Sequence, residues 1–367
     1  MNSSTGNRNG EVVFQLKEKN YTSTCRVSQC GYQYAEDEYL ALQKATQGQR
    51  GGINIVVLGD GYNAEDISNG TYLNDMKSQV ERFFDIEPYT TYRKYFNVYT
   101  AFPLSTEQGI GTVNTIRYNK FNTTFTGVNG LKADYDDIFN YALNAPTVTR
   151  DNLAQTLIII VPNSSEYGGI TQMWEDGRAI AFCPLSTDDY PFDSRGVIQH
   201  EAGGHGFGKL ADEYIYHNAF IDACHCSCCG HDDAVSYYQS LGWYDNISLS
   251  NKSQKVGWYH LVYDSRYSDI VDIYEGAYMH SRGVFRSEQN SCMNNDIPYY
   301  STISRESIVR RIMKYAGEPY TFESFVARDS RRATVGYTSN SRSRTTVSGS
   351  LHRSSARQHH SPVIHKK

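Results

Sequence analysis

Apolar residues along the chain occur in two alternating patterns. Short continuous apolar runs, typical of strands buried on both faces, predict strands at residues 53–58, 95–102, 157–161 and 179–182. Apolar residues at helical spacing predict helices at about residues 65–86 and 135–143. Because strands and helices alternate in this order, we expect an α/β fold with a mixed, mostly parallel twisted sheet and helices packed on it.

The two ends and the second half of the chain lack this alternation. Residues 1–50 are polar and mixed, with a helical stretch around Glu36–Lys44, and predict an N-terminal arm or small appendage. Residues 51–330 predict one large domain, with an N-terminal subdomain to about residue 214 and an irregular, tyrosine-rich C-terminal subdomain from about residue 215. Residues 331–367 are rich in Ser, Thr, Arg and His and predict a disordered basic tail.

Charge divides the chain into an acidic body and a basic tail. Of the 35 Lys and Arg residues, eight lie in residues 331–367, which contain no Asp or Glu, so 27 remain against 40 acidic residues, a net charge of −13. Such a body argues against nucleic acid as a partner, because nucleic-acid-binding domains need a basic surface. No apolar run approaches the ~20 residues that span a membrane, and the polar segment Met1–Gly6 does not resemble a signal peptide.

The candidate chemistry is concentrated in residues 200–214, which read His-Glu-Ala-Gly-Gly-His-Gly-Phe-Gly-Lys-Leu-Ala-Asp-Glu-Tyr. Imidazole and carboxylate groups are common zinc ligands. A glutamate directly after the first histidine is the residue that a zinc hydrolase uses as a general base. We therefore assign His200, His205 and Asp212 as metal ligands and Glu201 as the catalytic base.

The spacing of the two histidines differs by one residue from the His-Glu-x-x-His motif of zinc peptidases. On a regular helix, side chains five residues apart diverge by about 140° around the axis. A π-bulge lengthens one turn by one residue and would return His205 to the face of His200. Gly203 and Gly204 suit this distortion because neither carries a Cβ. The sequence therefore predicts a bulged helix at these two glycines.

The third ligand has alternatives. Gly208 lies three residues after His205, the offset at which a glycine bends the chain back in the metzincin pattern, and Asp212 follows four residues later. Glu213 could replace Asp212 as the ligand, or could instead orient a ligand histidine. Glu288 is a more distant candidate.

Four stretches together resemble the IgA-peptidase-like zinc metalloendopeptidases, a family of the zincin class. They are residues 59–62, 168–169, 200–214 and 283–293, and the resemblance covers about residues 50–325. It implies a zincin-like fold, one catalytic Zn²⁺, a protein or peptide substrate and a secreted, cell-surface or periplasmic location. The plain family motif lacks the extra glycine, and the motif does not imply immunoglobulin A as the substrate.

The resemblance also implies roles around the zinc. Zinc would polarise a water and the scissile carbonyl, while Glu201 would take the water proton and deliver it to the leaving amine. Met293 would form a Met-turn that packs under the ligand histidines. The tyrosine that follows this methionine by two residues in many metzincins is Asn295 here. Candidates for binding the transition state are instead Tyr278, His280, Tyr299 and Tyr300.

The zincin arrangement places the last strand of the sheet at an antiparallel edge along the substrate cleft. By this analogy, the strand at residues 179–182 would pair with an extended peptide substrate.

Two other interpretations stay open. The cluster Cys224–Cys229 could hold a second, structural zinc, form disulfides or contain free thiols. The whole chain could be an inactive zincin-fold module that binds glycans or proteins, or a zinc-dependent amidase for a non-peptide substrate. The intact Glu201 argues against the inactive module, because a decayed enzyme need not keep its base.

Overall fold

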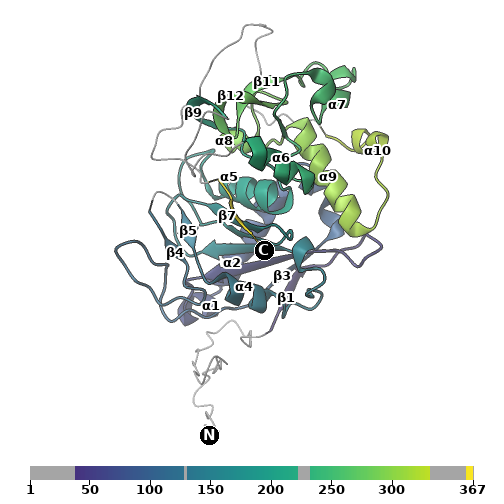
Figure 1. Cartoon of the computed structure of the whole chain (residues 1–367). Helices are drawn as coiled ribbons and strands as arrows, with labels where there is room; N and C mark the ends of the chain where they lie inside the picture. The colour runs from purple at the N-terminus through teal and green to yellow at the C-terminus, as the bar shows by residue number, and fades with distance from the viewer. Residues whose placement is uncertain (1–37, 128–129, 222–231, 331–360, 367) are drawn as a thin grey trace, which may run out of the picture.

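A computed structural model describes residues 38–127, 130–221, 232–330 and 361–366 (Figure 1). Its largest element is a seven-stranded sheet. In spatial order the strands are β1 (Leu40–Gln43), β3 (Phe96–Thr100), β2 (Ile53–Asp60), β6 (Leu157–Pro162), β8 (Ala179–Phe182), β7 (Ile170–Trp174) and β13 (Val363–His365). The four central strands run parallel, whereas β1 and β7 are antiparallel to their inner neighbours. The predicted mixed, mostly parallel sheet is therefore confirmed.

Helices cover both faces of this sheet because successive side chains of a strand point to opposite sides. Ile55 and Val57 of β2 join a cluster that includes the apolar faces of α2, η3 and α9, whereas Val56 and Leu58 join a cluster with α4. The helices of the first half of the chain are α1 (Ala64–Ser68), α2 (Thr71–Phe84), α3 (Tyr89–Tyr92), η1 (Arg93–Tyr95), α4 (Tyr135–Ala142), η2 (Leu153–Gln155), α5 (Ser194–Ile198) and η3 (Gln199–Phe207).

The second half of the chain forms a smaller body that lies above the large sheet in the view of Figure 1. It contains a four-stranded sheet of β9 (Ile215–Phe220), β10 (Ile247–Ser248), β11 (Tyr274–Ala277) and β12 (Met279–Arg286). Its helices are α6 (Asp232–Ser240), η4 (Ser253–Lys255), α7 (Tyr259–Tyr263), α8 (Cys292–Asn295), α9 (Thr302–Ala316) and α10 (Phe322–Val326). The small hairpin of β4 (Thr124–Phe125) and β5 (Leu131–Lys132) belongs to the first half.

Three expectations about the sheet are wrong. The stretch predicted as helical around Glu36–Lys44 contains β1, an edge strand that pairs with β3, so residues from 40 onward belong to the main body. The strand at residues 179–182 is internal and parallel to β6; the antiparallel strand beyond it is β7, which the apolar pattern did not reveal. Residues 361–366 of the predicted disordered tail contain β13, which pairs with β7.

None of the helices in the described part of the chain has the length and apolar character that crossing a bilayer requires.

Candidate metal centre

The motif at residues 200–214 begins in a helix that changes type. Asp193 caps the start of α5 by accepting a hydrogen bond from the Gly196 amide (3.0 Å). The helix then continues as the π-helix η3, Gln199–Phe207. The predicted π distortion at Gly203 and Gly204 is confirmed, although it extends over nine residues rather than one turn. The wider turn brings two histidines five residues apart onto one face.

Close packing explains the two glycines. A Cβ on Gly203 would lie 2.3 Å from the Tyr300 hydroxyl oxygen, and a Cβ on Gly204 would lie 2.3 Å from the Met293 sulfur. The hydroxyl of Tyr300 donates to the Gln199 carbonyl, and the hydroxyl of Tyr89 donates to the Gly203 carbonyl (2.6 Å). These tyrosines therefore satisfy buried backbone carbonyls of the π-helix. Met293 packs directly against it, beneath the turn that carries His205.

Three candidate ligand atoms converge. Nε2 of His200 lies 3.1 Å from Nε2 of His205, and each of these nitrogens lies 3.1 Å from Oδ1 of Asp212. All three residues are buried, with at most 1% of each exposed. Tetrahedral zinc with ligands at about 2.0–2.1 Å would hold its ligand atoms about 3.3 Å apart. The observed triangle is within a few tenths of an ångström of that size, so these residues fit a zinc ion.

The tautomers of both histidines follow from their other ring nitrogens. Nδ1 of His205 lies 2.8 Å from the Leu210 carbonyl. Nδ1 of His200 lies 3.0 Å from the Cys292 carbonyl and 3.1 Å from Oδ1 of Asp296. Because these partners can only accept, each Nδ1 carries the proton and donates it. In the neutral tautomers both Nε2 lone pairs therefore point toward each other and toward a carboxylate, an arrangement that a cation would stabilise.

Asp296 is a neighbour of the candidate ligand His200 that the sequence did not reveal. It is fully buried at the C-terminal end of α8, in the left-handed conformation (φ 56°), and it faces His200 from 96 positions away in the sequence. Burial lowers the pKa of His200, but the carboxylates of Asp212 and Asp296 outweigh it and raise the pKa well above its usual value. No motif spacing relates these two positions, so only the fold brings them together.

The chain turns back after η3 to deliver Asp212. Lys209 adopts the left-handed conformation (φ 55°), and the Leu210 amide donates to the Gly204 carbonyl (3.0 Å). A Cβ on Gly208 would lie 2.7 Å from that same carbonyl. Gly208 is therefore required for close approach, whereas the reversal itself occurs at Lys209. Burial raises the pKa of Asp212, but the adjacent His205 and His200 outweigh it and hold the carboxylate in its charged form.

The alternative ligands have other partners. Glu213 accepts from Asn246 (2.9 Å) and from the Ser291 hydroxyl, and so joins the end of the motif to the segment before α8. Burial raises the pKa of Glu213 to about 7, although these two hydrogen bonds lower it. Glu288 accepts from the Thr302 amide (2.6 Å) and the Tyr299 hydroxyl (2.6 Å). Among the described residues, the ligand group consists of His200, His205 and Asp212.

Glu201 lies on the same helix but outside the ligand triangle. It is fully buried, and its Oε2 is 2.8 Å from the Thr171 hydroxyl of β7. A Cβ on Gly169 would lie 3.0 Å from Cγ of Glu201, which explains why a glycine precedes β7 here. β7 and its preceding loop therefore position the predicted base.

The four residues predicted to bind the transition state differ in how they are connected to the candidate ligands. Tyr278 lies between β11 and β12, and its amide donates to the Asp212 carbonyl (3.0 Å). His280, also buried, donates from Nδ1 to the Tyr278 carbonyl (2.6 Å). Tyr299 and Tyr300 direct their hydroxyls to Glu288 and to the Gln199 carbonyl. Tyr278 is thus tied directly to a ligand residue, and its role and that of His280 stay predictions.

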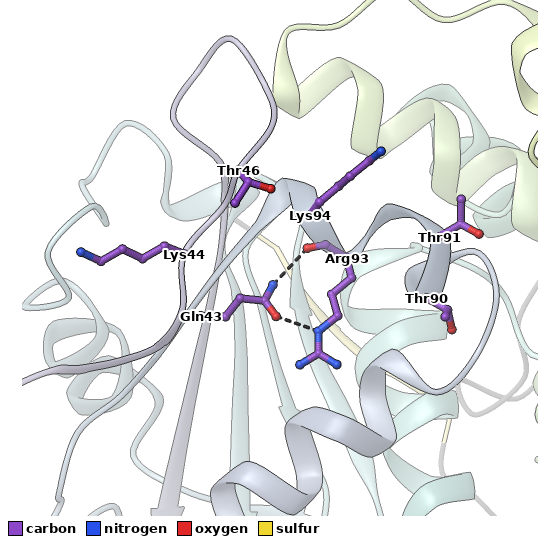
Figure 2. A pocket seen from close by; sticks show the side chains of 7 residues that line it. All are labelled: Gln43, Lys44, Thr46, Thr90, Thr91, Arg93 and Lys94. Carbon is purple, nitrogen blue, oxygen red and sulfur yellow. Dashed lines mark hydrogen bonds between the residues drawn. The ribbon is translucent and has the colours of Figure 1, made fainter.

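Two further features lie apart from this centre. The Cys224–Cys229 cluster falls outside the described residues. Among the described residues, Cys183 and Cys292 are buried thiols. A pocket at the end of β1 is lined by Gln43, Lys44, Thr46, Thr90, Thr91, Arg93 and Lys94 (Figure 2). Arg93 is paired there with Gln43 (2.7 Å) and with Glu81 (2.6 Å), and the lining contains no metal-ligating side chain.

Comparison with known proteins identifies a family that the chain resembles. A family model described as IgA Peptidase M64 matches residues 40–222, from the start of β1 through the whole of the motif that contains His200, Glu201, His205 and Asp212. The matched range ends before β12 and α8, and so does not include Asp296. No curated protein matches the chain.

Proposed function

Since the chain belongs to the IgA peptidase M64 family, a family of metallopeptidases, we propose that it is a zinc-dependent endopeptidase that hydrolyses peptide bonds of protein substrates. The observation that carries this proposal is the buried triangle of two imidazole nitrogens and one carboxylate oxygen, each 3.1 Å from the other two. Its size and chemistry suit zinc with a fourth position left for water.

His200, His205 and Asp212 would hold the ion, the Cys292 carbonyl would fix the ring of His200 by accepting from its Nδ1, and the carboxylate of Asp296 lies 3.1 Å from the same nitrogen. When bound, zinc supplies Lewis-acid polarisation of a water and a carbonyl. The buried carboxylates of Asp212 and Asp296 lie next to histidines, and an added cation would compensate their charge.

Glu201 would perform the proton transfers. Its carboxylate is held by the Thr171 hydroxyl and is excluded from water, two conditions that fix its orientation. In this role it takes a proton from the attacking water and then delivers it to the leaving amine. Because Glu201 directly follows His200 on the π-helix, its side chain leaves the helix on a different side from the ligand nitrogens.

Cleavage of a denatured protein mixture tests the proposal. Wild type should cut, chelator should abolish cutting, and Glu201→Ala should retain bound zinc while losing at least about 100-fold in rate. Glu166→Gln, at an exposed glutamate in the loop before β7, is the matched control and should cut like wild type.

Other outcomes would favour other functions. A chain that binds one zinc per molecule but cuts no protein would support the inactive binding module or the amidase for a non-peptide substrate. Equal cutting by Glu201→Ala and wild type would contradict the assignment of the base. Secretion or cell-surface location stays a prediction from the family resemblance.

A further inference from the structure

The edge of the large sheet beside Glu201 is occupied by the chain's own C-terminal segment. β7 pairs with β8 on its inner side and with β13 on its outer side, where Val363, Ile364 and His365 run parallel to Gln172, Met173 and Trp174. Figure 1 shows β13 in yellow beside β7. A peptide that added to this sheet as an outer strand would need the same edge.

β7 is also the strand that positions the base. Thr171 donates to Glu201, and Gln172, the next residue, is paired with Val363. Continuing this register by one residue sets Pro362 level with Thr171. The start of the C-terminal segment is therefore the part that lies nearest to the catalytic glutamate.

Contacts at both ends hold the segment in place. At its start, Ser361 Oγ lies 3.3 Å from the hydroxyl of Tyr214 and 3.1 Å from the sulfur of Met279. The ring of Tyr214 is stacked over that of His200, with centroids 6.3 Å apart, so Ser361 touches a neighbour of a ligand histidine.

At the other end of the segment, His365 makes three contacts with β7 and the turn after it. Its ring stacks on that of Trp174 (4.6 Å, 19°), and its Nε2 lies 2.8 Å from Oε1 of Gln172. Its carbonyl accepts from the Glu175 amide (3.1 Å). These are specific side-chain contacts in addition to the strand pairing, and they define one register.

The metal centre is closed in this arrangement. His200, His205, Asp212 and Glu201 each have at most 1% of their surface exposed. A substrate peptide cannot reach the ligand atoms or the base unless a neighbouring element moves. The segment of residues 361–366 is a suitable element, because it lies at the edge of the sheet and pairs there with β7.

We propose that residues 361–366 form an autoinhibitory strap that occupies the peptide-docking edge of β7 and must leave before a substrate can bind. The proposal rests on the proposed peptidase function. The substrate that would dock on this edge is an extended peptide segment, so the strap and the substrate compete for the same edge of β7.

The size of the effect follows from tethering. A covalently attached segment has an effective concentration of about 1 mM at its own binding edge. If the strap binds this edge with an intrinsic Kd of roughly 0.1 mM, molecules with a covered edge outnumber molecules with an open edge by about ten to one. Removing the strap should therefore raise kcat/KM by about tenfold toward an unstructured peptide.

The first experiment compares the full chain with a chain that ends at His360, both loaded with zinc. A fluorogenic unstructured peptide reports kcat/KM, and zinc content and circular dichroism report folding. His365→Ala, which removes the contacts to Trp174 and Gln172, should raise kcat/KM part of the way. Val363→Ala is the matched control within the strap, because the Val363 side chain is 42% exposed, and it should behave like the full chain.

The second experiment does not depend on activity. A labelled peptide with the sequence of residues 361–367 is titrated into the shortened chain carrying Glu201→Ala, and fluorescence anisotropy measures binding. We expect saturable binding by the shortened chain, about tenfold weaker binding by the full chain, and competitive inhibition of the active shortened chain.

The outcomes separate the strap from the peptidase proposal. Equal kcat/KM for shortened and full chains, with Glu201-dependent cutting in both, would overturn the strap and leave the peptidase intact. A shortened chain whose activity is lost and is restored by the added peptide would also overturn it, because the segment would then be a structural strand. If no form cuts, the peptidase proposal fails, and failure of the peptide to bind would separately refute occupancy of the edge.

Discussion

Replacing Gly203 by alanine should destabilise the protein through one identifiable atom. The new Cβ would lie 2.3 Å from the Tyr300 hydroxyl oxygen but 3.5 Å from Cζ of the same ring, which is an ordinary contact. Overpacking of this kind typically costs about 1–3 kcal/mol. In the opposite direction, alanine is favoured over glycine within a helix by about 1 kcal/mol. We expect a net loss of up to about 2 kcal/mol of unfolding free energy, together with weaker zinc binding.

Tyr300→Phe is the second variant of a double-mutant cycle, because it removes only the hydroxyl oxygen that the new Cβ would contact. On its own it should cost about 1–3 kcal/mol, since the buried Gln199 carbonyl loses its donor. In that background Gly203→Ala should cost close to nothing, leaving only the 3.1 Å contact with Tyr89. The double-mutant cycle should therefore show a coupling of up to about 2 kcal/mol in favour of the double variant.

Urea unfolding of the four proteins, with metal removed by chelator, measures the cycle without a contribution from zinc. A parallel zinc titration reports whether His200 and His205 still converge. The reasoning would be refuted if Gly203→Ala stabilised the wild type, or if it cost the same in both backgrounds. Either result would mean that the π-helix is not constrained by contact with Tyr300.

Three further predictions concern the site. Asp212→Ala should lower zinc affinity by more than about 100-fold, because a ligand is lost. Glu213→Gln is the control and should keep the zinc content, measured by metal analysis, near one per chain. An equal loss of zinc in both variants would contradict the choice of Asp212. Asp296→Asn should weaken zinc binding by about 10–100-fold in competition with a chelator, because the negative charge 3.1 Å from Nδ1 of His200 is lost. Unchanged affinity would remove Asp296 from the site. Thr171→Val should lower kcat about tenfold with KM and zinc content unchanged, because the Thr171 hydroxyl orients Glu201. Thr171→Ser keeps a hydroxyl and should have the kcat of wild type. A change confined to KM would argue against a role of Thr171 in positioning Glu201.

The strands and helices of the first half could be predicted because their signals are local. The runs at 53–58 and 157–161 are apolar throughout, and they became the two central strands β2 and β6. β7 gave no such signal, because Thr171 and Gln172 interrupt its apolar residues. The structure explains these polar side chains: Thr171 binds Glu201, and Gln172 binds His365. A strand whose polar residues serve a site and a partner strand cannot be recognised from hydrophobic pattern alone.

Part of the candidate site could be predicted from the spacing of residues along the sequence. An interval of five between His200 and His205, with two glycines inside it, is incompatible with a regular helix that presents both imidazoles to one ion, and the structure has a π-helix there. Asp296 was not accessible, because it reaches His200 through the left-handed end of a four-residue helix. The choice of Asp212 over Glu213 also depended on distant residues, since Asn246 and Ser291 bind Glu213.

The sequence by itself determined the kinds of ligand, the base beside the first histidine and the need for an irregular helix, because each of these is expressed within fifteen consecutive residues. Only the tertiary structure decided which carboxylate faces the imidazoles, which strand holds Glu201 and which segment covers the edge of that strand. Those choices depend on pairs such as His200 with Asp296 and Gln172 with Val363, which lie far apart in the chain. Their contacts are set by how the two halves of the chain pack, and local residue preference carries no information about that packing.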